Sequence, residues 1–95
     1  MIVGCARVSL ALHGVGSLKE KRSIVKTVLH RVTAKFHVAG AETGDLDYPQ
    51  SAELGFALVG NDRRFVNSVL DKMLVYLNDL GLAEVVGEDI EILNL

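Results

Sequence analysis

The sequence contains little cysteine, little proline and few aromatic residues. Among 95 residues there are one cysteine, one proline, no tryptophan, two tyrosines and three phenylalanines. The lone cysteine, Cys5, excludes an internal disulfide and a zinc site built from several cysteines, a usage typical of a reducing cytosol. The predicted strands carry no pair of aromatic side chains, which excludes the base-stacking platform of an RNA-recognition motif.

Long hydrophobic runs are also missing. No segment approaches the roughly 20 apolar residues that cross a membrane, and Arg7 interrupts the apolar N-terminal segment before it has the form of a signal peptide. The composition, 49% hydrophobic and 23% charged, is that of a globular protein rather than a disordered one. We therefore expect a single soluble, cytoplasmic domain over residues 1–95, with no membrane partner.

Acidic residues are scarce in the first part of the chain, and basic residues are scarce in the second. Residues 1–37 hold seven basic side chains and one acidic one, a net charge of +6. Residues 38–95 hold three basic and eleven acidic side chains, a net charge of −8. This asymmetry is compatible with a basic binding surface, and equally with two segments that attract each other in the folded protein.

Hydrophobic patterns predict six elements. Apolar residues alternate with polar or small ones over 2–12 and 52–59, which predicts two half-buried strands, and further strands are expected over 38–43 and 83–93, the last interrupted at 87–89. Apolar stripes at helical spacing predict helices over 17–36 and from 61–62 to about 80. Ser17 and Glu20 have the spacing of a capping box, and Gly81 suits a left-handed helix stop.

The order β-α-β-β-α-β predicts an α+β fold, the ferredoxin-like split βαβ sandwich. One four-stranded antiparallel sheet would carry both helices on one face. This topology brings the segment 14–17 and the acidic turn 44–50 to the same end of the sheet. Asp45 and Asp47 are therefore expected near Lys19, Lys21 and Arg22, where they would either neutralise the basic end of the first helix or leave it free.

The segment that leads into the first helix has the residues of an anion site. Gly14 and Gly16 precede the helix N-terminus, where exposed backbone amides and the helix dipole favour a negative charge, and Ser17, Lys19 and Arg22 would add donors. The spacing matches neither the Walker loop nor the dinucleotide fingerprint. The alternative is a tight turn followed by an ordinary helix cap.

Basic side chains recur every three or four residues along one flank of the first helix. Lys19, Arg22, Lys26 and His30 form this row, which has the spacing needed to follow phosphates. The alternative is a solvated helix surface that does no more than keep the protein in solution.

No set of side chains predicts catalysis, a metal site or a cofactor. The three histidines, His13, His30 and His37, lie in three different predicted elements, and no ligand spacing recurs. We expect a protein that is not an enzyme.

The sheet face away from the helices is predicted to be small-featured and half apolar. Such a face often meets a second copy or a partner, so a homodimer through this face is one hypothesis. Arg7 and Glu53 are expected to pair across its centre. The residues predicted on it are Val3, Cys5, Arg7, Ser9, Ala11, Glu53, Gly55, Ala57 and Val59.

Three segments resemble the YlxP-like family of small bacterial proteins, a domain of unknown function. They are the run Ser-Leu-Lys-Glu-Lys-Arg-Ser at 17–23 followed by Val25-Lys26, the pair Ala41-Glu42, and the stretch from Ala52-Glu53-Leu54-Gly55 to Asn61-Asp62. The resemblance covers nearly the whole chain and implies the ferredoxin-like fold. It implies no catalytic residues, and the family's genes often lie among those for transcription and translation factors, which suggests RNA or the ribosome as a partner.

Two functional hypotheses follow. The first is a small non-enzymatic protein that associates with RNA or ribosomal particles, with Lys19, Arg22 and Lys26 on phosphates and the 14–17 amides as an anion seat. The second is a homo-oligomeric interaction module, or a small-ligand sensor, that uses the open sheet face.

Overall fold

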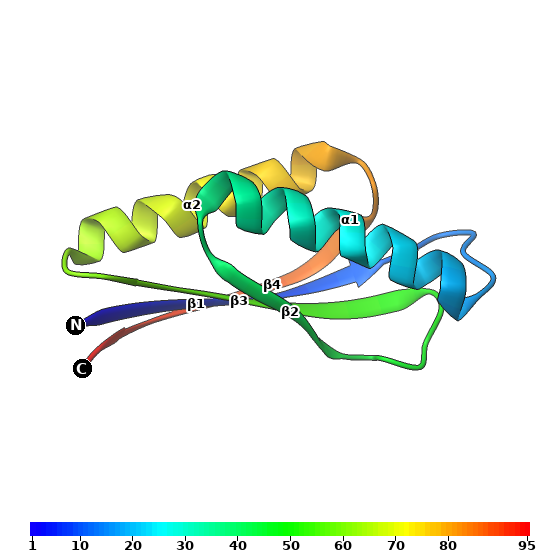
Figure 1. The fold of residues 1–95 in the computed structure, drawn as a ribbon, viewed down its shortest axis with the longest axis horizontal. Helices are drawn as coiled ribbons and strands as arrows, with labels where there is room; N and C mark the ends of the chain where they lie inside the picture. Colours follow the sequence, from blue (N-terminus) through cyan, green and yellow to red (C-terminus); the bar gives the residue numbers. More distant parts are fainter.

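A computed structural model describes all of residues 1–95, and its six elements follow the predicted order (Figure 1). The first and third strands alternate in burial as expected, and each helix follows a residue whose side chain caps it. The elements are β1 (Ile2–Ala11), α1 (Leu18–Phe36), β2 (Ala39–Gly44), β3 (Ser51–Gly60), α2 (Arg63–Leu80) and β4 (Glu84–Asn94).

The four strands form one antiparallel sheet in the order β2-β3-β1-β4. Both helices cover the same face of this sheet, and the other face is open (Figure 1). α1 packs on β2 and on α2, whereas α2 packs across β1, β3 and β4. The predicted ferredoxin-like split βαβ sandwich is therefore confirmed. No helix has both the length and the apolar character that crossing a membrane requires.

The core lies between the helices and the sheet, where 18 buried hydrophobic residues form one cluster. In β1 and β3 every second side chain is buried from the start of the strand, because successive side chains point to opposite faces. Val25, Val28 and Val32 contribute the α1 side of the cluster. Val66, Leu70, Met73, Leu74 and Leu77 contribute the α2 side.

The helix ends follow the predicted chemistry. Asp62 caps α2 by accepting a hydrogen bond from the Arg64 amide at 3.0 Å. Gly81 ends the same helix in the left-handed conformation, with φ at 69°, which costs a glycine little because it has no Cβ. At the end of α1, His37 adopts the same conformation and its amide reaches the carbonyl of Thr33.

The predicted interruption of the last strand is wrong. β4 runs without a break over Glu84–Asn94, and Gly87 pairs with Ser9 of β1. The irregularity lies one residue earlier, because Leu10 pairs with Val85 and leaves Val86 as an extra residue in a bulge. Pairing with a central strand therefore holds residues 87–89 in the sheet despite their low intrinsic preference for it.

Candidate nucleic-acid interface

The basic side chains predicted on the first helix lie together on the surface of α1. Lys19, Arg22, Lys26 and His30, which we call the basic stripe, are all exposed. The chain has three ion pairs, Arg7–Glu53, His13–Glu84 and Lys21–Glu42, and none of them involves the basic stripe. The positive charge of Lys19, Arg22 and Lys26 is thus left without a protein partner.

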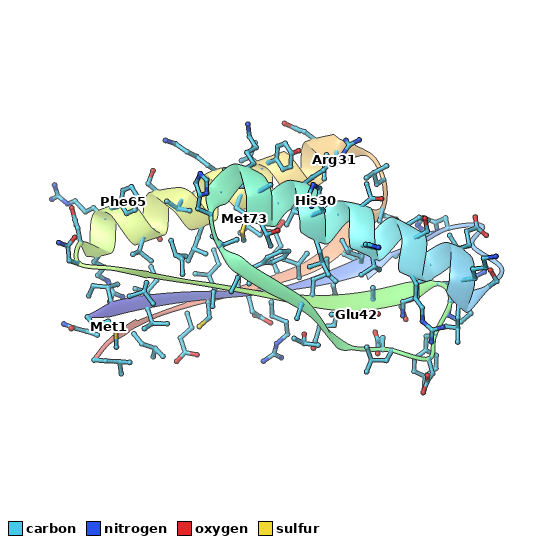
Figure 2. All side chains as sticks on the ribbon, in the orientation of Figure 1. Met1, His30, Arg31, Glu42, Phe65 and Met73 are labelled. Atoms are coloured by element: carbon cyan, nitrogen blue, oxygen red, sulfur yellow. The ribbon has the colours of Figure 1, made fainter.

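A shallow groove runs beside the basic stripe, between α1 and β2. It has a volume of about 380 Å³, and Arg22, Lys26 and His30 form part of its wall on the helix side. Figure 2 shows His30 and Arg31 on the outer side of α1 and Glu42 on the strand below. The rest of the lining is Val25, Leu29, Thr33, Gly40 and Glu42. The groove gives an extended ligand a place to lie against the stripe.

One lysine of the same helix is not part of this surface. Lys21 is fully buried, with 0% of its surface exposed, and its Nζ lies 2.9 Å from Oε2 of Glu42. Oε2 is the buried oxygen of the Glu42 carboxylate, so this ion pair is shielded from water. The ammonium group donates its hydrogen bond to the backbone carbonyl of Asp45.

The acidic turn forms no ion pair with the basic end of α1. A hydrogen bond joins the turn to Lys21, and there the turn uses the backbone carbonyl of Asp45, a residue in the left-handed conformation with φ at 56°. Neither the Asp45 nor the Asp47 carboxylate forms an ion pair with Lys19 or Arg22. Of the two outcomes left open by the sequence, the structure has the one that leaves the stripe free.

Two of the four backbone amides of 14–17, those of Val15 and Gly16, donate to the chain itself. The Ser17 hydroxyl accepts from the Glu20 amide at 3.1 Å, as a capping box requires. The returning bond differs from the predicted one, because the Glu20 carboxylate accepts from the Gly16 amide at 3.5 Å rather than from Ser17. The Val15 amide donates to the Leu12 carbonyl. A negative charge of the chain thus already sits where the anion seat at Gly14, Gly16 and Ser17 was expected.

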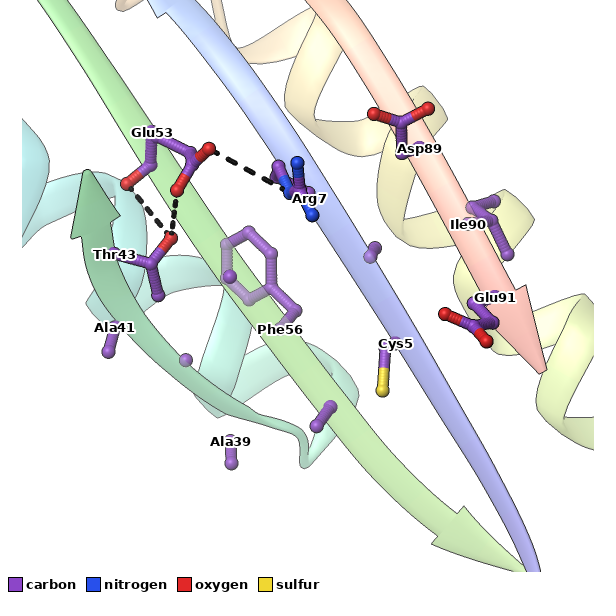
Figure 3. Close-up of a pocket in the computed structure, with 14 residues that line it drawn as sticks. Cys5, Arg7, Ala39, Ala41, Thr43, Glu53, Phe56, Asp89, Ile90 and Glu91 are labelled. Atoms are coloured by element: carbon purple, nitrogen blue, oxygen red, sulfur yellow. Dashed lines mark hydrogen bonds and ion pairs between the residues drawn. The ribbon is translucent and has the colours of Figure 1, made fainter. Parts of the chain in front are cut away.

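The open face of the sheet carries the opposite charge from the stripe. Arg7, at its centre, is exposed and lies 3.8 Å from Glu53, the predicted cross-strand pair (Figure 3). Strand register places Asp89 opposite Arg7 and Glu91 opposite Cys5, so these two carboxylates of β4 share the face. One arginine therefore stands among three acids. A concavity of about 950 Å³ spans these residues and the small side chains of β2 and β3.

Comparison with known proteins places the chain in a family. Residues 3–90 match the model of a family described as a protein of unknown function, DUF503. The chain belongs to this family. It is 34% identical over 77 residues to the uncharacterized protein YlxP of Bacillus subtilis (strain 168), which covers 81% of this chain and 84% of that protein. The predicted YlxP-like membership is confirmed, and the function of the family is uncharacterised.

A solved structure supports the fold of this DUF503 chain. The crystal structure of an acylphosphatase from Bacillus subtilis superposes with a TM-score of 0.55, covering 100% of this chain and 88% of the acylphosphatase chain. The sequence identity is 14%, so the likeness concerns the fold alone.

The structure brings some predicted site residues together and separates others. Lys19, Arg22 and Lys26 share one exposed surface, whereas the 14–17 segment lies at the start of the helix and is engaged in capping. Sequence reasoning missed the groove beside β2 and the burial of Lys21. The latter had a signal, because Lys21 falls at helical spacing between Leu18 and Val25 in the apolar stripe.

Proposed function

We propose that this DUF503 chain is a non-enzymatic protein that binds RNA, including the RNA of ribosomal particles, through the basic stripe of α1. The observation that carries the proposal is that Lys19, Arg22 and Lys26 are exposed and unpaired, although an acidic turn lies against the same helix. The one α1 cation that pairs with a carboxylate is the buried Lys21, through Glu42. Exposed, unpaired cations at this spacing suit phosphate groups.

The length of the basic stripe suits a short stretch of RNA sugar-phosphate backbone. Lys19 and His30 are eleven residues apart, which is about 16 Å along a helix at 1.5 Å per residue. A strand that contacts the whole stripe would therefore place only a few of its phosphates on it. The groove between α1 and β2 runs beside part of this length, and Arg22, Lys26 and His30 line it. The proposed footprint is therefore small, and we expect weak, salt-sensitive affinity.

The charge of the open sheet face also favours RNA contact through α1 rather than through the sheet. Glu53, Asp89 and Glu91 surround the single Arg7 there, so phosphates would be repelled from this face and attracted to the helix layer. RNA would then contact α1 and leave the sheet exposed.

The test is a titration of the protein into fluorescent fragments of ribosomal RNA at several salt concentrations. In one variant Lys19, Arg22 and Lys26 become Glu, and in a matched control the three basic residues of α2, Arg63, Arg64 and Lys72, become Glu. Both variants change the net charge of −2 by the same six units, so total charge is matched between them.

We expect the stripe variant to bind far more weakly than the wild type, with measurable binding at low salt only, and the control to retain most of its affinity. Each phosphate contact on a single strand adds about 0.7 to the slope of log K against log salt, so the wild-type slope should exceed that of the stripe variant by about two. Absence of wild-type binding even at low salt, or equal weakening by both variants, would refute the proposal.

The concavity on the open face favours a second candidate, an interaction module that forms a homodimer or senses a small ligand. This concavity is lined by small side chains of β2 and β3 around the exposed Arg7. In a symmetric dimer the arginine of each copy would have to pair with the carboxylates of the other, because the face is otherwise acidic. Arg7→Glu is then expected to convert a dimer to a monomer in light scattering. A wild-type protein that is monomeric at all concentrations and shows no ligand-induced melting shift would rule this candidate out.

A further inference from the structure

A separate small cavity lies where the β1–α1 loop meets the turn between β2 and β3. It has a volume of about 360 Å³ and is distinct from the groove beside the stripe. Two segments far apart in the sequence form its wall. They contribute Val15 and Gly16 on one side and Tyr48, Pro49, Gln50 and Ser51 on the other. We call this cavity the Tyr48 pocket.

The wall of the Tyr48 pocket is held in place by bonds that reach into the rest of the fold. The Leu12 amide donates to the Gln50 carbonyl at 2.9 Å, which joins the two segments directly. The carbonyl of Asp45 accepts from the buried Lys21 ammonium and from the Tyr48 amide. The turn is therefore fixed against the first turn of α1, and the pocket is a formed feature of the surface.

The chemistry of the pocket suits a flat, uncharged group. Tyr48 is 63% exposed, so a large aromatic ring stands in water beside a hollow with no protein partner over it. Such a ring offers a stacking surface, and the Gln50 and Ser51 side chains offer hydrogen-bonding groups at the rim. An anion is disfavoured, because the Gly16 amide is already occupied by the Glu20 carboxylate and Asp47 belongs to the same turn.

The pocket also lies at the start of the basic stripe. Gly16 precedes α1, and Arg22 follows it by six residues, which is about 9 Å along the helix axis. This distance is short enough for a few nucleotides of one strand to span it. A strand whose phosphates follow Lys19, Arg22 and Lys26 can therefore place the base at one of its ends in the pocket.

We propose that the Tyr48 pocket binds an unpaired nucleobase of the RNA whose phosphates lie on the basic stripe. The ring of Tyr48 stacks on the base, and the pocket makes the protein select single-stranded RNA over duplex, since a paired base cannot leave its stack to enter. This inference rests on the proposed function and adds to it the form of RNA that is bound.

The experiment compares a single-stranded RNA hexamer with an RNA duplex on four proteins: wild type, Tyr48→Ala, Tyr48→Phe and Leu46→Ala. Leu46→Ala is the matched control, because Leu46 is a large exposed side chain of the same turn that does not line the pocket. Stacking of one base is worth about 1–3 kcal/mol, so Tyr48→Ala should weaken hexamer binding by roughly five- to 150-fold. Binding of the duplex should not change.

Tyr48→Phe and Leu46→Ala should bind the hexamer as the wild type does, and the slope against salt should be the same for all four proteins, because no phosphate contact is removed. A hexamer that carries 2-aminopurine at one end reports stacking directly by quenching of its fluorescence. The inference is overturned if Tyr48→Ala binds the hexamer normally while the stripe variant loses it, an outcome that leaves the proposed function intact. If the wild type binds neither RNA, both proposals fail together.

Discussion

The ion pair between Lys21 and Glu42 offers the sharpest test of how this fold is held together. Lys21 is completely buried on α1, whereas the Glu42 side chain retains 15% exposure and lines the groove beside β2. The pair joins the first turn of α1 to the edge strand of the sheet. We predict that replacing either partner destabilises the protein, that Glu42→Leu costs more than Lys21→Met, and that the double variant recovers most of the loss.

The magnitudes follow from the unequal burial of the two partners. Glu42→Leu leaves an ammonium group sealed in the interior, and removal of one member of a buried pair costs about 3–5 kcal/mol. Lys21→Met preserves the length of the side chain and leaves a carboxylate that can turn into the groove, so we expect the lower cost of an unsatisfied polar group, about 1–2 kcal/mol. The double variant has no buried charge, and such replacements are often neutral or stabilising by about 1–4 kcal/mol.

Thermal and urea unfolding measure these differences. At roughly 4–8 °C per kcal/mol for a domain of this size, Glu42→Leu should lower Tm by at least about 12 °C. Arg7→Met is the control, because the Arg7–Glu53 pair is exposed and 3.8 Å apart, and such a pair is worth at most about 1 kcal/mol. Single variants whose losses simply add in the double variant would show that the pair is not coupled and would refute the argument.

Two further predictions concern packing and capping. Gly4→Ala should lower the free energy of unfolding by about 1–3 kcal/mol, because the added Cβ would lie 2.5 Å from Val66 Cγ1. A Cβ added at Gly16 meets nothing within 4 Å, so Gly16→Ala should not destabilise the protein. Equal urea midpoints for the two variants would contradict this prediction. Ser17→Ala should cost about 1 kcal/mol by removing the acceptor of the Glu20 amide. Urea unfolding measures that loss too, and an unchanged midpoint would mean that the cap contributes nothing.

Sequence patterns were sufficient for most of the fold because local signals and tertiary packing agree. The alternation in β1 and β3, the Ser17 cap and the Gly81 stop each describe a local requirement that the folded chain satisfies. The last strand was predicted less well. Gly87 has a weak preference for a strand, and its place in β4 depends on pairing with Ser9, about 80 positions earlier in the chain.

The candidate site was predictable only where the helix alone determines exposure. The spacing of Lys19, Arg22 and Lys26 places them on one flank, and the structure agrees. The burial of Lys21 follows from its place in the apolar stripe of the helix, but its partner Glu42 lies on β2, which the helix pattern does not contain. The Tyr48 pocket could not be predicted either, because it depends on a contact between segments far apart in the sequence. It exists because the Gln50 carbonyl meets the Leu12 amide, a contact between two loops.

The separation of charge between the two faces of the sheet gives the molecule an electric polarity. Its positive pole is the helix layer, with the basic stripe, and its negative pole is the open sheet, where Glu53, Asp89 and Glu91 outnumber Arg7. In the field of a polyanion this polarity exerts a torque that turns α1 inward before any contact forms. Encounters would thus begin already oriented. The sheet would face outward throughout, so a second molecule could reach it while the first is still bound.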